Sequence, residues 1–272
     1  MGETENPKVT TICLVNYKTL DLIQLALRSI RKFTHYPYEV VVVDNDSRDE
    51  SLEYLKSLDW IELIERADKA NDDSGGYAHA AALDMALAGC DTEFFASMHS
   101  DTFVHKDGWL GELMKYFEQD NTACVGGGKV ELVPRWRKLL KKYTDFKTFK
   151  HRLLRTPDPL GIYRYYNRTV CSIYRTYILK KENLSFLMYR DKGLTVGKKL
   201  YFELVDKGYN TFELPDKVMN RYIYHLAHAT QTVNPEFDNI RGRTRRKTNR
   251  LIKKIYNSPE VQDILKDDSL DK

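Results

Sequence analysis

The chain has 272 residues, of which 42% are hydrophobic and 30% are charged, and its formal net charge at pH 7 is +4. This composition is that of a soluble globular protein, long enough to bury the core of one large domain or two small ones. Residues 1–11 lack the apolar core of a signal peptide, and no apolar run approaches the roughly 18 residues of a transmembrane helix.

The cysteines point to a reducing compartment. They stand far apart, without a CxxC pair, and three of them lie in apolar or small-residue runs. We therefore expect buried free thiols at Cys13, Cys90, Cys124 and Cys171, and a cytoplasmic protein.

Strands and helices are predicted to alternate along the first 130 residues. Short apolar runs predict buried strands at 9–17 and 38–47, and further strands are predicted near 60–65, at 92–98 and at 122–130. Apolar residues at helical spacing, and one glycine-led, alanine-rich segment, predict helices at 19–33, 48–57, 72–89 and 109–117. Such alternation predicts an α/β fold with a mostly parallel sheet flanked by helices, which binds ligands beyond the carboxyl ends of its strands.

The pattern changes after residue 133. Residues 134–155 hold nine Lys/Arg and one acid, with apolar side chains at helical spacing, and residues 239–256 hold eight Lys/Arg and no acid. Between them, residues 168–223 carry strand-like runs and a helix at 196–207. The polar residues 263–272 are expected to fray.

Polar residues follow three of the predicted strands, at Asn16, Asp44 and Asp101. Asp44 ends VVVD, where it could accept hydrogen bonds from a base or ribose, or serve only the turn; both readings are open. The turn after the first strand has neither a GxGxxG nor a P-loop pattern. The charge of a bound diphosphate would therefore be met in another way, of which a divalent cation held by a carboxylate is the usual one, and Asp101 is placed for that.

Asp101 has an alternative role as the cap of the helix that follows. The apolar stripe of that helix begins only at Trp109, so Asp107 is the better cap candidate, which leaves Asp101 free for a metal.

Four segments in order, TTICLVNYKTLDLIQLALRSI, VVVDNDSRDES, a glycine-led helix and FFASMHSD, resemble the family 2 glycosyltransferases of the GT-A fold. The resemblance covers residues 9–130 well and extends loosely to about 235. It implies that the last Asp of the DxD-like triplet, Asp101, binds the metal, with His99 in place of the first Asp. It also implies contacts to the nucleotide sugar from Val15, Asn16, Tyr17, Asp44, Asn45, Asp72, Gly76, Asp84, His99 and Ser100.

Asp84 stands where the family has an Asn, and a solvated helix carboxylate is its alternative. KGYNTFELPDKVMNRYIYHLAHAT resembles the closing segment of the family, which implies His225 as a further ligand of Mn²⁺ or Mg²⁺, with His228 as its competitor.

The general base is the point at which the sequence departs from the family pattern. The acidic pair of inverting members falls here on Val196-Gly197, and the Asp of an alternative Asp-x-Gly falls on Thr195. The nearest carboxylate is Asp191, in a glycine-containing loop. Either Asp191 or another residue is the base, or activity is impaired.

The resemblance implies metal-dependent, inverting transfer of a sugar from a UDP-, GDP- or dTDP-linked donor to a hydroxyl of a glycan or lipid-linked acceptor, in the synthesis of cell-surface polysaccharide or glycoconjugate. It further implies a single domain over residues 1–238, with a nucleotide-sugar half (9–130) and an acceptor half (131–238), before a basic extension (239–272). A catalytically silent domain that binds sugar nucleotide or a partner, and a sugar nucleotidyltransferase, are the rival functions.

The basic stretches 134–155 and 239–256 have three readings. They form a solvated face with apolar stripes packed inward, or contact an anionic membrane surface, which would make the protein peripheral on the cytoplasmic face. Nucleic-acid binding is the least favoured reading, because the aromatic residues follow helical spacing and do not form a stacking platform.

Overall fold

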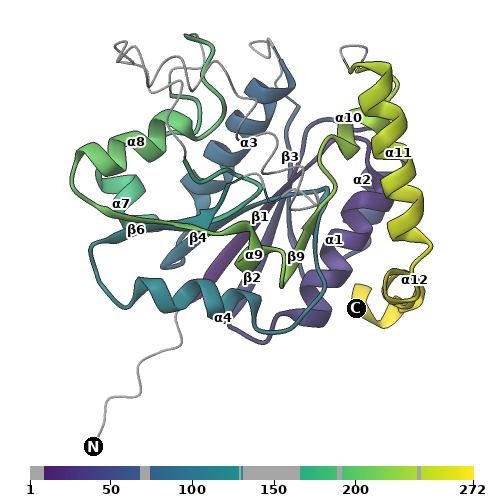
Figure 1. The fold of residues 1–272 in the computed structure, drawn as a ribbon, viewed down its shortest axis with the longest axis horizontal. Helices are drawn as coiled ribbons and strands as arrows, with labels where there is room; N and C mark the ends of the chain where they lie inside the picture. The colour runs from purple at the N-terminus through teal and green to yellow at the C-terminus, as the bar shows by residue number, and fades with distance from the viewer. Residues whose placement is uncertain (1–8, 68–73, 129, 131–165, 189–191, 238–239) are drawn as a thin grey trace, which may run out of the picture.

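The computed structural model describes residues 9–67, 74–128, 130, 166–188, 192–237 and 240–272. These residues form a seven-stranded sheet with helices on both faces, and a separate two-stranded sheet (Figure 1). The predicted segments 134–155, Asp72 and Asp191 lie outside the described residues.

The large sheet is mostly parallel, as predicted. In spatial order its strands are β3 (Glu62–Glu65), β2 (Tyr38–Asp44), β1 (Thr10–Asn16), β4 (Phe94–His99), β7 (Cys171–Arg175), β6 (Thr122–Gly127) and β8 (Asn210–Leu214). β7 alone among them runs antiparallel to its neighbours β4 and β6. Asn16 pairs with Asp44 and Val15 with His99, so the carboxyl ends of β1, β2 and β4 meet at one edge.

Alternate side chains of the strands fill two cores, one on each face. Ile12 and Leu14 of β1 pack with α1 (Leu20–Phe33), α2 (Glu50–Lys56) and α4 (Trp109–Met114), which continues into the 3-10 helix η1 (Lys115–Phe117). Cys13 and Val15 pack with the opposite layer of α3 (Gly75–Gly89), α7 (Thr176–Lys181) and α8 (Lys198–Asp206). All four cysteines are free and buried, as expected.

The two-stranded sheet was not predicted. β5 (Thr102–Val104) pairs antiparallel with β9 (Ile223–His225), with Thr102 opposite His225. The amide of Leu226 also donates to the Asp101 carbonyl at 2.8 Å. This pairing brings Asp101 and His225 together from distant parts of the chain.

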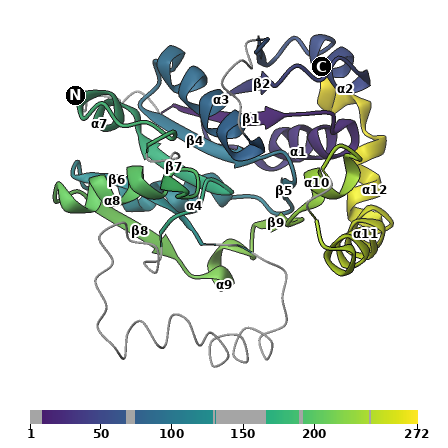
Figure 2. The same ribbon diagram turned by 90° about the horizontal axis from the view of Figure 1, so that it is seen from above.

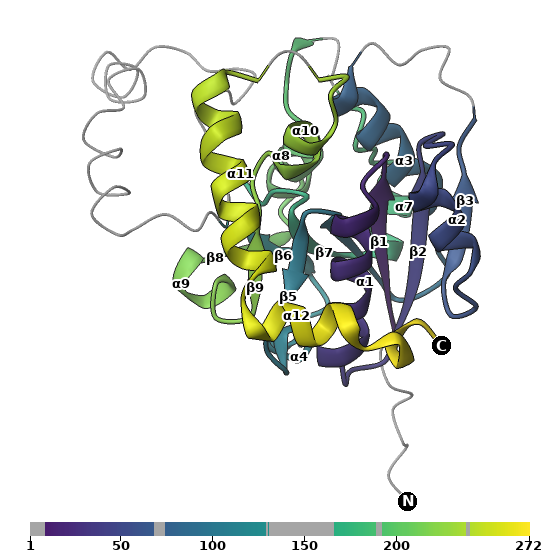
Figure 3. The same ribbon diagram turned by 90° about the vertical axis from the view of Figure 1, so that its right-hand side faces the viewer.

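The C-terminal residues are docked, so the expectation that they fray is wrong. After α9 (Asp216–Met219), α10 (Ala229–Val233) and α11 (Gly242–Tyr256), the chain forms α12 (Pro259–Lys266) and the 3-10 helix η3 (Asp268–Asp271). Figures 2 and 3 show α12 beside α1. Arg28 of α1, only 3% exposed, donates to the Leu265 carbonyl and to the carboxylates of Asp268 and Asp271.

The predicted helix cap at Asp107 is also wrong. Gly108 is the N-cap of α4, in a left-handed conformation with φ 83°, and no side chain caps the helix. Asp107 instead lies 2.9 Å from Nε2 of His35. In the described parts of the chain, no helix combines the length and apolar character needed to cross a bilayer.

Candidate active site

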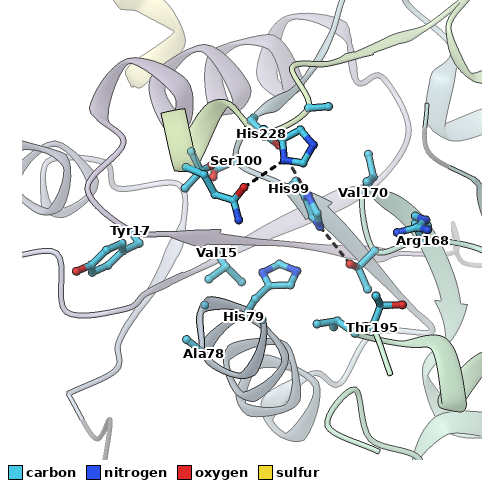
Figure 4. A pocket seen from close by; sticks show the side chains of 18 of the residues that line it. Val15, Tyr17, Ala78, His79, His99, Ser100, Arg168, Val170, Thr195 and His228 are labelled. Atoms are coloured by element: carbon cyan, nitrogen blue, oxygen red, sulfur yellow. Dashed lines mark hydrogen bonds and ion pairs between the residues drawn. The ribbon is translucent and has the colours of Figure 1, made fainter. Parts of the chain in front are cut away.

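A cleft of about 740 Å³ opens beyond the carboxyl ends of β1 and β4, where the parallel sheet predicts a ligand site (Figure 4). One wall is the end of β1 with the first turn of α3, and the floor is the end of β4. Residues 166–170 and 195–196 form the far wall, and residues 225–237 complete the rim.

Three side chains at the centre of the cleft could hold a metal ion: His99, Asp101 and His225. One ligand atom from each lies within 4.8 Å of the others. Asp101 Oδ1 is 3.3 Å from His225 Nε2 and 3.8 Å from His99 Nδ1. The Asp101 side chain is only 7% exposed.

The hydrogen bonding of this group fits a divalent cation. Asp101 Oδ2 accepts from the Ala229 amide at 3.3 Å, but the buried Oδ1 makes no well-aligned hydrogen bond with any described residue. A buried carboxylate oxygen without a partner is costly, and a bound cation would remove that cost. Nε2 of His99 lies 3.1 Å from the Thr169 hydroxyl, which leaves Nδ1 facing Asp101.

The pKa shifts of Asp101 and His99 favour the forms that bind metal. Burial opposes the ionisation of Asp101, but His225, His99 and the Ala229 amide outweigh it and hold the pKa of Asp101 below its ordinary value. Burial, with the neighbouring His79, lowers the pKa of His99 to about 3, so His99 is a neutral imidazole at pH 7.

His228, the competitor of His225, lines the cleft rim but is not part of the three-residue group. Its Nδ1 lies 3.1 Å from the Gln231 side-chain oxygen, and the pair is drawn in Figure 4.

Asp44 and Asn45 have different surroundings although they are adjacent. Asp44 is fully buried and does not line the cleft; its carboxylate accepts from the Asn16 amide, the Ser47 amide and the Ser47 hydroxyl at 2.8, 2.8 and 2.5 Å. Asn16 is likewise buried in this network. Asn45 lines the cleft, and its side-chain oxygen accepts from Arg66 at 3.1 Å. The contacts of Asp44 are therefore those of a residue that stabilises the turn, the second of the two roles considered for it.

Asp84 is another predicted contact that lies away from the cleft lining. Its carboxylate accepts from the Ser185 hydroxyl at 2.6 Å and from the amides of Phe186 and Leu187 at 2.8 and 3.3 Å. It is therefore neither a cleft residue nor a solvated carboxylate, but anchors residues 185–187 to α3. Of the other predicted nucleotide-sugar contacts, five line the cleft: Val15, Tyr17, Gly76, His99 and Ser100.

Comparison with known proteins identifies the fold and the family. The family model described as glycosyl transferase family 2 matches residues 11–180, more than half of the chain. The chain belongs to glycosyltransferase family 2. No curated protein sequence matches it significantly.

Solved structures share the fold at low sequence identity. The mannosyltransferase PcManGT from Pyrobaculum calidifontis, in complex with GDP-Man and Mn²⁺, has a TM-score of 0.54 at 21% identity, over 78% of this chain and 56% of its own. TarS 1–349 from S. aureus has a TM-score of 0.50 at 19% identity, and the match covers 94% of this chain and 69% of the TarS chain. GalNAc-T7 with UDP, GalNAc and Mn²⁺ has a TM-score of 0.52 at 13% identity, and the match covers 81% of this chain and 44% of the GalNAc-T7 chain.

The chain therefore spans little more than half the length of the mannosyltransferase. At these identities the likeness establishes the fold, a GT-A architecture, which agrees with the prediction from the sequence.

Several cleft residues of this family 2 glycosyltransferase were not found from the sequence. His79 of α3 packs edge-on against His99 at a centroid distance of 4.8 Å, and burial lowers its pKa to about 4. The buried Nε2 of His79 has no hydrogen-bond partner within the described part of the chain. Its position three residues past Gly76, on the helix that begins at the cleft, is the one signal that could have found it.

The rim segment after α10 was also missed. Glu236 bonds both the Tyr17 hydroxyl and the Lys18 ammonium, and Asn234 donates to the Tyr17 carbonyl at 3.0 Å. Phe237 packs edge-on against Tyr17 with centroids 6.0 Å apart. These contacts join segments that are 217 or more residues apart, so no local sequence pattern predicts them.

Proposed function

We propose that this family 2 glycosyltransferase moves a sugar from a nucleotide-sugar donor to a hydroxyl group, in a divalent-metal-dependent, inverting reaction. The observation that supports this most strongly is the buried, unsatisfied Oδ1 of Asp101 between two imidazoles in a cleft at the strand ends. Mn²⁺ or Mg²⁺ suits this set of oxygen and nitrogen ligands.

In this proposal Asp101 and His225 hold the cation, and His99 completes the group or contacts the donor beside it. When bound, the cation supplies positive charge that stabilises the leaving diphosphate. Tyr17 and Asn45 bind the nucleoside end of the donor; Arg66 orients the Asn45 amide through its 3.1 Å hydrogen bond. Structures of similar fold hold GDP-Man with Mn²⁺ and UDP with Mn²⁺, which supports testing both nucleotides.

In this proposal the acceptor binds at the other end of the cleft, at Arg168 and Thr195 (Figure 4). Tyr166 also lines the cleft, and its hydroxyl bonds to that of Thr195. Among the described residues, the carboxylates that line the cleft are Asp101 and Glu236, and Glu236 is bonded to Tyr17 and Lys18. The general base is therefore proposed to come from Asp191, which would take the proton of the acceptor hydroxyl as that oxygen attacks the sugar C1.

A catalytically silent domain is the second candidate, and one observation favours it. Thr195, where the family pattern has a carboxylate, lines the cleft and bonds through its hydroxyl to that of Tyr166. Such a domain would bind the nucleotide sugar without transferring it. We further propose a cytoplasmic role in polysaccharide or glycoconjugate synthesis, with a glycan or lipid-linked acceptor.

Turnover of a donor panel distinguishes the two candidates. The full chain would be incubated with Mn²⁺, UDP-, GDP- and dTDP-sugars and a panel of glycan and lipid-linked acceptors, with release of nucleoside diphosphate as the readout. We expect one donor to be consumed by the wild type, and consumption to fall about 100-fold or more in Asp191→Ala, as for loss of a general base. Donor binding without consumption by the wild type would favour the silent domain instead.

A further inference from the structure

α11 carries a basic face that the cleft does not use. Its apolar residues pack inward: Leu251, Ile252, Ile255 and Tyr256 join a cluster with Phe103, Leu226, Val261 and Ile264. α12 then fixes the C-terminal end of this unit to α1. The helix is therefore a firmly seated element, and its apolar side is already covered by the protein itself.

The opposite side of α11 is a stripe of exposed cations. The first of them is Arg243, and the others follow it by three, four, seven, ten and eleven residues, which places all six on one helix face. At 1.5 Å per residue, this face is about 16 Å long. The members of this stripe are Arg243, Arg246, Lys247, Arg250, Lys253 and Lys254.

Among the described residues, none forms an ion pair with these six cations, whereas other exposed lysines have acidic partners. Lys56 pairs with Glu65 at 3.1 Å, Lys115 with Glu112 at 2.8 Å and Lys207 with Glu182 at 2.8 Å. No ion pair joins the stripe to any described residue, and residues 242–256 contain no acid. The stripe is therefore an uncompensated positive surface, which favours an anionic partner.

The stripe begins near the rim of the cleft. Phe237 lines the cleft, and Arg245 in the first turn of α11 donates to the Phe237 carbonyl at 2.7 Å. Figures 1 and 3 show α11 on the outside of the molecule, with its N-terminal end at the same edge as α10 and the start of α3. A partner on the basic face would thus lie beside the opening through which an acceptor enters.

We propose that the basic face of α11 binds the surface of an anionic lipid membrane and holds the cleft mouth close to that surface. The exposed face is a broad patch of charge on a convex helix, which suits a layer of anionic headgroups. Its apolar residues are committed to the protein interior, so binding is electrostatic, without insertion of the helix, and salt weakens it.

A nucleic-acid partner fits this surface less well. The sole aromatic residue of α11 is Tyr256, which packs into the interior cluster, so the exposed face offers no ring for stacking on bases. The membrane contact would bring a lipid-linked acceptor to the cleft, and this purpose rests on the proposed transferase function. The contact itself does not depend on that function.

Vesicle sedimentation of the full chain tests the proposal directly. The probes are phosphatidylcholine vesicles with and without phosphatidylglycerol, at low salt. We expect the wild type to bind the phosphatidylglycerol vesicles alone, and Arg246→Gln/Lys247→Gln/Arg250→Gln to lower the partition coefficient about 100-fold. The matched control Lys106→Gln/Lys217→Gln/Arg221→Gln removes three exposed cations from other elements and should bind as the wild type does.

Unchanged vesicle binding by the α11 variant, or equal binding to both kinds of vesicle, would overturn the proposal. Tighter binding to a DNA or RNA oligonucleotide than to the anionic vesicles would do the same. The α11 variant should keep its melting temperature and its thermal shift with Mn²⁺ and nucleotide, since its changes are exposed and outside the cleft. The vesicle assay therefore tests the membrane proposal alone. The thermal shift with Mn²⁺ and nucleotide tests the proposed function separately.

Discussion

Asp44 and Asn45 illustrate how two adjacent polar residues divide structural and binding roles. Asp44 closes the turn after β2 and ties it to β1 through Asn16. Its two oxygens take up three donors, so its charge is compensated inside the protein. Asn45 extends into the cleft from the same turn. A strand-end carboxylate can thus support the wall of a cleft without lining it.

We predict opposite effects for alanine at these two positions. Asp44→Ala removes the acceptor of the Ser47 amide and hydroxyl and one of the acceptors of the Asn16 side chain, and should lower the free energy of unfolding by about 3 kcal/mol. Asn45→Ala should leave stability nearly unchanged and weaken UDP or GDP binding in the presence of Mn²⁺ about tenfold, the loss of one good hydrogen bond. Urea denaturation and calorimetric titration measure the two effects. Stable Asp44→Ala protein with impaired nucleotide binding would reverse our assignment.

Which residues lie at the strand ends was easier to predict from the sequence than which contacts they make. Asp101 follows directly from the apolar run before it, because a strand end is a local signal. His225 came only from the resemblance to the family, since its partner across β5 and β9 is more than 120 residues away. Asp84 was misplaced because its helix position is compatible with either the cleft or the segment at 185–187, and packing alone decides between them.

At the scale of elements, α12 and η3 are the least expected feature. Their sequence is polar, so local pattern suggests a frayed end. The structure anchors them through Arg28, whose guanidinium is buried among acceptors from the C-terminal residues. Tyr54 of α2 donates to Asp271 at 2.8 Å and completes the network. This buried cation and the apolar contacts of Val261 and Ile264 together dock the C-terminal residues.

We predict that Asp271→Asn destabilises the protein in a pH-dependent manner. Burial opposes ionisation of Asp271, but the hydrogen bonds from Arg28 and Tyr54 outweigh it and hold its pKa below the ordinary value. A carboxyl with a lowered pKa in the folded state contributes stability above its unfolded pKa of about 3.9 and loses that contribution as the pH falls through the folded value.

The variant should therefore be less stable than the wild type by about 1–2 kcal/mol at pH 7, with the difference shrinking below about pH 4. Urea unfolding across this pH range measures it, and Asp91→Asn, at a carboxylate that is 99% exposed, is the control. A difference that is constant with pH would show that the charge of Asp271 has no part in docking the C-terminal residues.

At the scale of the whole molecule, local sequence pattern predicts the large-sheet strands of residues 9–130, whereas the other strands depend on distant contacts. The five strands predicted within residues 9–130 all form. Four of them are mostly apolar runs that the sheet buries, whereas β3 is a short edge strand whose ends are exposed. The antiparallel β7 and the small β5–β9 sheet depend on pairing between remote segments, and three-residue strands are too short to show a period. These are the elements that bring His225 and Thr169 to the site.

The most direct test of the account is the binding of Mn²⁺ to the full chain in the presence of UDP or GDP, measured by isothermal titration calorimetry. We predict that the wild type binds a single Mn²⁺, and that Asp101→Asn weakens this binding at least about tenfold. Asp107→Asn, which changes an exposed carboxylate outside the cleft, should bind as the wild type does. Undiminished Mn²⁺ binding by Asp101→Asn would contradict the metal site on which the proposed function depends.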